Sequence, residues 1–156
     1  MLPTEKKRHL KTIADFPKEL RRRVIPLSDE QTRARPLAEE WSVREIVHHC
    51  ADSHMNSFIR LKLVLTEDNP TVRPYDQDAW VTLADTTVSP LAHSLNMLDG
   101  LHSRWVELFS SLDESQWVRT GFHPESGVIT PDTLLLSYAD HCQAHLAQID
   151  RVLAAM

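Results

Sequence analysis

The chain is poor in glycine, with only three in 156 residues. Folds built from strands and tight turns generally need more, because glycine adopts positive φ angles without steric cost. The scarcity therefore favours an all-α fold. A hydrophobic content of 42% is sufficient for a core, and the length is typical of one domain. We expect a single domain over residues 1–156.

The chain also has little that would place it in a membrane or an oxidising compartment. It has no apolar run near the roughly 18–20 residues of a membrane span, and its first residues lack the apolar region of a signal peptide. The only two cysteines, Cys50 and Cys142, are expected to be buried thiols. A net charge of −5 gives no general reason to bind nucleic acid. We expect a cytoplasmic protein that binds neither membranes nor nucleic acid.

Four segments place apolar residues at helical spacing: residues 5–25, 42–65, 90–111 and 131–154. Three of them begin with strong start signals, namely the Ser42/Glu45 capping box and a Ser or Thr N-cap before Pro90 and Pro131. Together they predict a four-helix bundle.

The connections are expected to be mostly irregular, with short extra helices. We predict a helical turn after Ser28, a short helix within residues 75–83, a break over residues 84–90, and a turn and loop in residues 113–129. The sequence has almost no strand signal.

The last helix carries His141 and His145 four residues apart, on the side that faces the bundle. This spacing places two imidazoles on one face, as in many transition-metal sites. Two hydrogen-bonded histidines without a metal would show the same spacing. A useful site needs a third ligand, which the 42–65 helix offers in His48, His49 or His54. The helical phase does not decide among these three. Asp52 or a cysteine thiolate would be a further alternative.

A stripe of polar groups runs along the 42–65 helix and includes His49, Asp52, Asn56 and Arg60. It lines an internal cleft or forms a salt-bridged exposed face. In a cleft, Asn56 and Arg60 would hold an anionic or amide-bearing substrate, because the guanidinium binds carboxylate or phosphate through two hydrogen bonds. A salt bridge is the alternative for Arg60. Arg73 and Tyr75 would rim the cleft or pack within their loop.

Four stretches of the chain together resemble the DinB/YfiT-like superfamily, specifically the YfiT branch. They are residues 41–80, beginning WSVREIVHHCADSHM, and the later LHSRWVELFSSL, HPESG and YADHCQAHLAQI. The resemblance implies a four-helix bundle whose divalent ion, usually zinc or nickel, is bound by His49, His141 and His145. It also implies a homodimer. The branch commonly has further histidines where this chain has Ala144 and Gln148, which puts the surroundings of the ion and the substrate in question.

The resemblance implies a metal-dependent hydrolase or an S-transferase that uses a low-molecular-weight thiol such as bacillithiol. Three histidines leave a coordination position open. That position would hold a water for hydrolysis or a thiolate for transfer to a small-molecule electrophile. A helical bundle that serves as a non-catalytic binding or stress-response module is the alternative.

Overall fold

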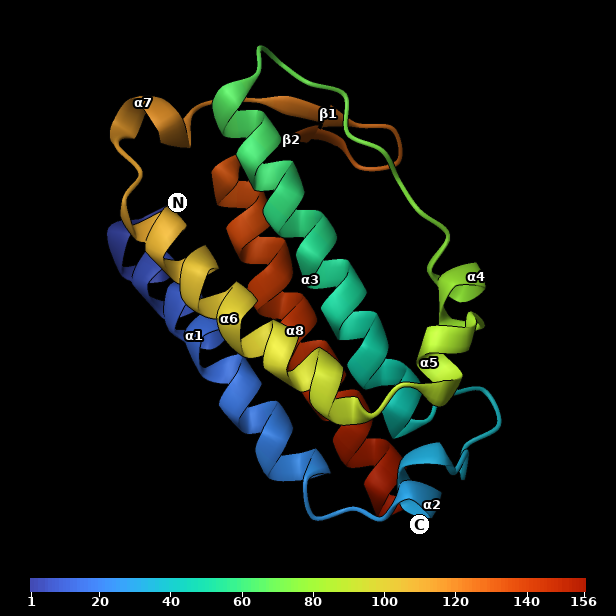
Figure 1. Cartoon of the computed structure of the whole chain (residues 1–156). Coiled ribbons are helices and arrows are strands. Elements are labelled where there is room, and N and C mark those ends of the chain that lie inside the picture. The colour runs from blue at the N-terminus through green and yellow to red at the C-terminus, as the bar shows by residue number, and fades with distance from the viewer.

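Four long helices form the body of the molecule in a computed structural model that describes residues 1–156 (Figure 1). They are α1 (Pro3–Val24), α3 (Val43–Thr66), α6 (Leu91–Ser110) and α8 (Pro131–Ala154). Helix α1 packs against α6 and α8, and α3 packs against the same two helices from the other side. The predicted all-α four-helix bundle is confirmed.

The helices do not simply alternate in direction. Figure 1 shows that α3 and α6 run one way and that α1 and α8 run the other. The segment from residue 67 to residue 90 therefore returns along the outside of the bundle before α6 begins. It carries the short helices α4 (Gln77–Val81) and α5 (Ala84–Val88). This connection crosses beside α3 and forms one wall of the candidate site.

The predicted helix boundaries are close to those observed. Ser42 and Thr130 cap α3 and α8 by accepting hydrogen bonds from Glu45 N–H and Thr133 N–H. Helix α1 continues without a break through the buried Pro17. Before α6, Pro90 and not Ser89 occupies the N-cap position, so that helix starts one residue later than expected. The turn after Ser28 is α2 (Asp29–Arg33), and the turn in residues 113–117 is α7 (Glu114–Trp117).

The prediction of a break over residues 84–90 was wrong in part, because residues 84–88 form helix α5. Long-range contacts stabilise it. The buried Arg44 on α3 donates from Nε to the carbonyl of Thr86 at 3.0 Å and from Nη2 to the carbonyl of Ser89 at 2.7 Å. Thr86 is itself buried. A short helix that depends on such contacts leaves little signal in its own residues.

The connection over residues 113–129 also contains more than the expected turn and loop, because residues 121–129 form a small antiparallel hairpin. Strand β1 (Gly121–His123) pairs with β2 (Gly127–Ile129), and Gly127 supplies the positive φ of 77° at the turn. Phe122 also exchanges hydrogen bonds with the backbone of residues 70–72. A Cβ on Gly121 would lie 2.9 Å from a Val64 methyl and 3.1 Å from the carbonyl oxygen of Pro70. Only glycine therefore allows the hairpin to approach α3 this closely.

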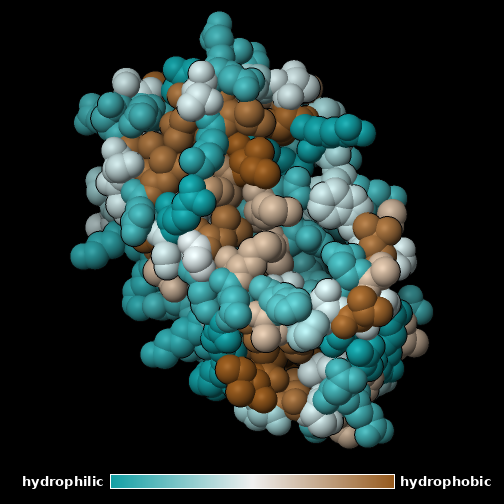
Figure 2. Space-filling view, in the orientation of Figure 1, coloured by the Kyte–Doolittle hydropathy of each residue, from teal (hydrophilic) through white to brown (hydrophobic).

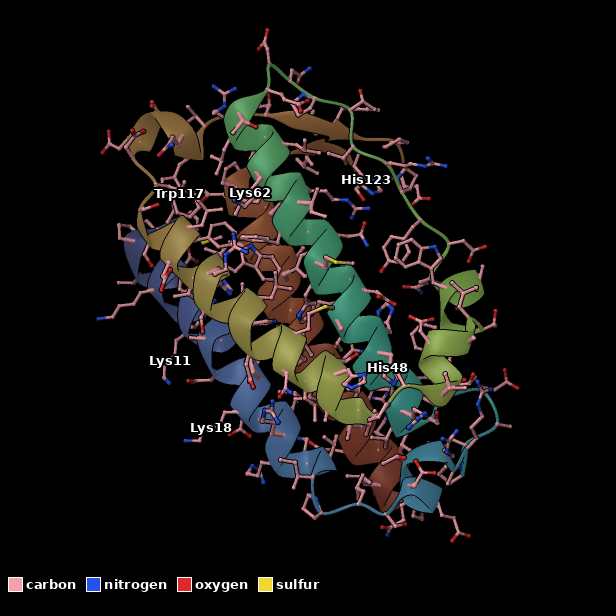
Figure 3. The ribbon with its side chains drawn as sticks, viewed as in Figure 1. Lys11, Lys18, His48, Lys62, Trp117 and His123 are labelled. Atoms are coloured by element: carbon pink, nitrogen blue, oxygen red, sulfur yellow. The ribbon has the colours of Figure 1, made fainter.

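Polar side chains cover most of the surface in the view of Figure 2, and hydrophobic groups appear in separate patches. In Figure 3, Lys11 and Lys18 project away from α1, whereas His123 lies between the hairpin and α3. None of the helices is both long and apolar enough to span a membrane.

Candidate metal centre

Three histidines from two helices converge on one point. His49 comes from the middle of α3, and His141 and His145 come from α8. The Nε2 atom of His141 lies 3.3 Å from Nε2 of His49 and 3.1 Å from Nε2 of His145. All three candidate ligand atoms lie within 4.8 Å of one another. The structure thus brings together the three histidines that the resemblance implied.

The spacing and the protonation of these rings fit a divalent ion. Ligands about 2.0–2.1 Å from a tetrahedral zinc are separated by about 3.3 Å, close to the two shorter Nε2 separations. Burial, together with the smaller effect of the neighbouring His145, lowers the pKa of His49 to about 4 and that of His141 to about 2. The rings are therefore neutral near pH 7, which is the form that binds metals.

A chain of buried hydrogen bonds fixes the tautomer of His141. The Ile13 carbonyl oxygen can only accept, so Nδ1–H of His102 donates to it at 2.7 Å. His102 Nε2 then accepts from Nδ1–H of His54 at 2.7 Å, and His54 Nε2 accepts from Nδ1–H of His141 at 3.0 Å. His54 and His102 are 0% and 1% exposed. This series of hydrogen bonds leaves the Nε2 lone pair of His141 directed at Nε2 of His49 and Nε2 of His145.

His145 is oriented in the same way by a different set of residues. Its Nδ1–H donates to Oε1 of Gln148 at 2.8 Å, and the Gln148 amide donates to Oε2 of Glu40 at 2.7 Å. Arg151 holds that carboxylate at 2.9 Å and, with Gln148, lowers the pKa of Glu40. Gln148, one of the two departures from the family pattern, therefore performs the positioning task that a metal-binding imidazole requires. Trp41 packs against the His49 ring with the ring centroids 4.8 Å apart.

The other candidate ligands lie elsewhere. His48 bonds Ser94 through Nδ1 at 2.8 Å, and His54 belongs to the hydrogen-bond chain behind His141. Asp52 is not part of the three-histidine group, and burial together with the Asp85 charge raises its pKa to about 6. Cys50 and Cys142 are free and buried, and burial raises the pKa of both thiols, so neither is available as a thiolate.

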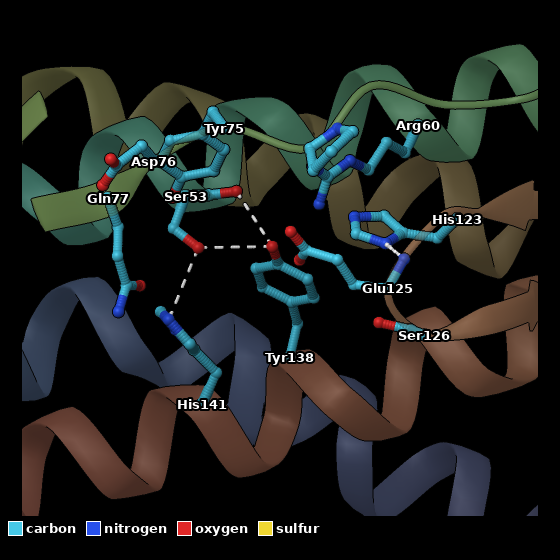
Figure 4. Close-up of a pocket in the computed structure, with 11 residues that line it drawn as sticks. Ser53, Arg60, Tyr75, Asp76, Gln77, His123, Glu125, Ser126, Tyr138 and His141 are labelled. Atoms are coloured by element: carbon cyan, nitrogen blue, oxygen red, sulfur yellow. Dashed lines mark hydrogen bonds between the residues drawn. The ribbon is translucent and has the colours of Figure 1, made fainter. Parts of the chain in front are cut away.

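A cavity of about 730 Å³ opens beside His141 (Figure 4). Its lining includes Ser53, Tyr75 and Tyr138. Tyr138 donates its hydroxyl proton to the Ser53 carbonyl at 3.1 Å. The Ser53 hydroxyl lies 3.2 Å from the Tyr138 oxygen and 3.4 Å from Nε2 of His141. Two hydroxyl groups therefore stand at the boundary between the histidines and the cavity.

Some of the residues considered for substrate contact line the cavity, and others lie beside it. Arg60 lines the cavity, which favours the cleft interpretation of the polar stripe. The Asn56 amide donates back to the Asp52 carbonyl at 2.9 Å and lines a smaller neighbouring pocket. Tyr75 lines the main cavity and packs on Trp80, whereas Arg73 contributes its carbonyl to Arg60.

Comparison with known proteins agrees with this architecture. The family model described as the DinB superfamily matches residues 12–149. The chain belongs to the DinB superfamily. Over 88% of its length it is 43% identical to an Oceanobacillus iheyensis protein named "Putative metal-dependent hydrolase", 79% of which is covered. Over 93% of its length it is 38% identical to the Bacillus subtilis protein "Putative metal-dependent hydrolase YfiT", 82% of which is covered.

Solved structures also match the chain. One is that of YfiT from Bacillus subtilis, described as "a probable metal-dependent hydrolase with an unusual four-helix bundle topology". It matches with a TM-score of 0.93 and 37% identity over 97% of this chain and 87% of that one. A mycothiol-dependent maleylpyruvate isomerase matches with a TM-score of 0.74 and 14% identity, over 95% and 61% of the two chains. The latter shows a shared fold only. The names of the relatives and the three-histidine group together support a divalent metal.

Sequence reasoning missed part of the site. His102 lies on the apolar stripe of α6, and a histidine at such a position is a signal that its nitrogens have buried partners. Ser53 and Tyr138 share helix faces with the ligands, so their presence could have been anticipated. His123 enters the cavity from β1, and nothing in its local sequence indicated that location.

Proposed function

We propose that this protein is a divalent-metal-dependent enzyme in which His49, His141 and His145 bind the ion and the adjoining cavity binds a small-molecule substrate. The observation that carries the proposal is the convergence of three Nε2 atoms beside a cavity of about 730 Å³. A closed structural site would have a fourth protein ligand, whereas three ligands beside a cavity leave room for a reactant. Zinc or nickel is the expected ion.

The reaction is either hydrolysis or the transfer of a low-molecular-weight thiol to an electrophile. When bound, the ion would lower the pKa of a water or thiol at its open position. The relatives' names support hydrolysis. Thiol transfer requires a thiol from outside the chain, because both cysteines are buried and their raised pKa keeps them protonated.

The chain's own residues would orient the reactant and manage one proton. With Nε2 of His141 occupied by the ion, the Ser53 hydroxyl proton is free to point to Tyr138 or to a bound reactant. Tyr138 is held by its bond to the Ser53 carbonyl, so its oxygen remains an acceptor aimed at this place. Asn56 and Arg60 are the remaining candidates for substrate contact. A homodimer stays a prediction from the resemblance, and a cytoplasmic location stays a prediction from the sequence.

The test begins with metal content. Protein purified without a polyhistidine tag and supplied with zinc or nickel should retain one ion per chain after dialysis, and His49→Ala should retain none. The loaded protein is then assayed for conjugation of a thiol to an electrophile and for ester or amide hydrolysis without thiol. Loss of either activity in His49→Ala supports the proposal. Failure of the wild-type protein to retain metal would favour the non-catalytic binding module.

A further inference from the structure

Arg60 is a cation without a carboxylate partner. None of the ion pairs in the molecule includes it. Nη2 donates to the Arg73 carbonyl at 2.9 Å, which anchors the side chain to the loop before α4. Nε is buried and has no acceptor. Because a guanidinium has five N–H donors, most of its hydrogen-bonding capacity remains available to a ligand. The salt bridge considered for Arg60 from the sequence is not formed.

His123 offers a second donor to the same space. Its Nδ1 accepts the backbone N–H of Glu125 at 3.2 Å, so the proton of the neutral ring lies on Nε2. The side chain is 8% exposed and lines the cavity together with Arg60. The Arg60 charge and burial both lower the pKa of His123, burial being the larger cause. An anion bound between the two groups would accept hydrogen bonds from both.

The position of this pair relative to the histidine ligands suggests a two-point binding site. Figure 4 shows Arg60 and His123 toward one end of the pocket and His141 toward the other. Tyr138 lies between them along α8. Arg60 and His123 also line an adjoining cavity of about 320 Å³, which extends the space on their side. A molecule in the main cavity can therefore contact His141 and the Arg60–His123 pair together.

The acidic residues in the cavity restrict which anion fits. Glu125 and Asp76 both line it. The Asp76 carboxylate caps α4 by accepting the Ala79 N–H at 2.9 Å, whereas the exposed Glu125 side chain makes no hydrogen bond or ion pair and points into the pocket (Figure 4). Two carboxylates that line the same cavity as one guanidinium disfavour a doubly charged group. A singly charged carboxylate matches the guanidinium fork and meets less repulsion.

We propose that Arg60 and His123 form a carboxylate subsite, and that the substrate or thiol co-substrate carries a carboxylate bound there while its reacting group lies at His49, His141 and His145. This inference rests on the proposed metal-dependent function. It narrows the substrate class to small molecules that carry a carboxylate. The loop anchored by Arg60 and the hairpin carrying His123 then determine substrate choice.

The first test uses cobalt-loaded protein and two thiols that differ only in a carboxylate and a hydroxyl. Titration with 3-mercaptopropionate and 2-mercaptoethanol is followed by the cobalt–thiolate charge-transfer absorption. The wild type should bind the carboxylated thiol about ten-fold or more tightly, as expected for a charge-assisted pair. Arg60→Gln should abolish this preference and leave 2-mercaptoethanol binding unchanged. Arg22→Gln, the same charge change on the exposed face of α1, is the matched control and should retain the preference.

The second test does not depend on the metal. Binding of propionate and inorganic phosphate to the metal-free protein is measured by NMR titration of the histidine ring resonances. Propionate should shift His123 and should bind more tightly than phosphate. Arg60→Gln should weaken propionate binding about ten-fold, and Glu125→Gln should strengthen it, because a neighbouring negative charge is removed.

The two tests separate this inference from the proposed function. Equal binding of both thiols with an intact absorption band would overturn the carboxylate subsite and leave the metal site standing. Absence of any band, with propionate bound through Arg60, would overturn the thiol function and keep the subsite. Propionate binding that is absent from the wild type, or unchanged in Arg60→Gln, contradicts the subsite in either case.

Discussion

The two walls of the cavity are built in different ways. The helical wall belongs to α3 and α8 and exposes His141 to the cavity. Hydrogen bonds and ring packing hold His141 and the other two histidines of these helices. The opposite wall comes from the connection around Pro74–Gln77 and from the hairpin, joined to α3 through Arg60. Fewer hydrogen bonds hold the side chains of this wall, and the Glu125 carboxylate makes no hydrogen bond or ion pair.

This difference suggests a division of tasks. A metal site requires ligand positions accurate to a fraction of an ångström, which packed helices provide better than loops. A substrate wall made of connections can change without disturbing the ligands. The helical wall should therefore determine metal affinity, and the connecting wall should determine which molecule enters. Substitutions on each wall, followed by measurements of metal affinity and stability, test that separation.

Loss of a ligand on the helical wall should abolish metal binding. His145→Ala removes one of three donors, so the affinity for zinc should fall by more than the roughly 10–100-fold that follows loss of an outer-shell partner. Tyr75→Phe, on the connecting wall, should leave the affinity within about two-fold of wild type. Competition against a chromophoric chelator measures both. A similar loss in both variants would show that the walls are not separate.

Loss of the hydrogen-bond chain behind His141 should have the next largest effect. His102→Phe fills the buried space and leaves Nδ1–H of His54 without its acceptor. His141 then loses its fixed tautomer, and metal affinity should fall about ten-fold or more. Nitrogen NMR of the imidazoles should show mixed tautomers of His141 in this variant and one tautomer in the wild type. Unchanged tautomers and affinity would rule out a positioning role for His102.

The buried histidines behind the helical wall should also make the metal-free protein sensitive to acid. Burial lowers the pKa of His102 to about 4, against about 6.5 in the unfolded chain. The unfolded state therefore binds protons first, so the stabilisation is complete above about pH 6.5 and is lost as the pH falls toward 4. Urea unfolding at pH 7.5 and 5 should show this loss, with a smaller difference for His102→Phe. A free energy of unfolding that is greater at pH 5 would contradict the assignment of neutral buried histidines.

The smallest effect is expected at the hairpin. Gly121→Ala places a methyl 2.9 Å from Val64 and 3.1 Å from the Pro70 carbonyl, so the hairpin must shift. The cost should be about 1–3 kcal/mol of stability, as for other overpacked sites. Thermal unfolding measures it, and zinc affinity should stay within about two-fold. Loss of zinc binding here would mean that the connecting wall supports the ligands after all.

The long helices and the ligand pair could be predicted because their signals are local. Capping residues at Ser42 and Thr130 and the four-residue spacing of His141 and His145 depend only on neighbouring positions. Helix α5 and the hairpin could not be predicted in this way, because each depends on distant contacts, such as Arg44 with Thr86 and Phe122 with residues 70–72.

The choice among His48, His49 and His54 illustrates the same limit within the site. All three are buried on α3, and helical phase alone could not separate them. The packing of α3 against α8 and α6 separates them: His49 meets His145, His54 meets His102, and His48 meets Ser94. Only the resemblance to the family selected His49 in advance. The use of His54 and His102 to orient a ligand emerged from the structure.

The most direct test of the metal centre is anomalous scattering, recorded at the metal absorption edge from crystals of zinc- or nickel-loaded protein. We expect one peak, about 2.0–2.1 Å from Nε2 of each of His49, His141 and His145 for zinc. We also expect a further coordination position that faces the cavity. A peak bound by His48 or His54, or loaded crystals without a peak between α3 and α8, would contradict the three-histidine site.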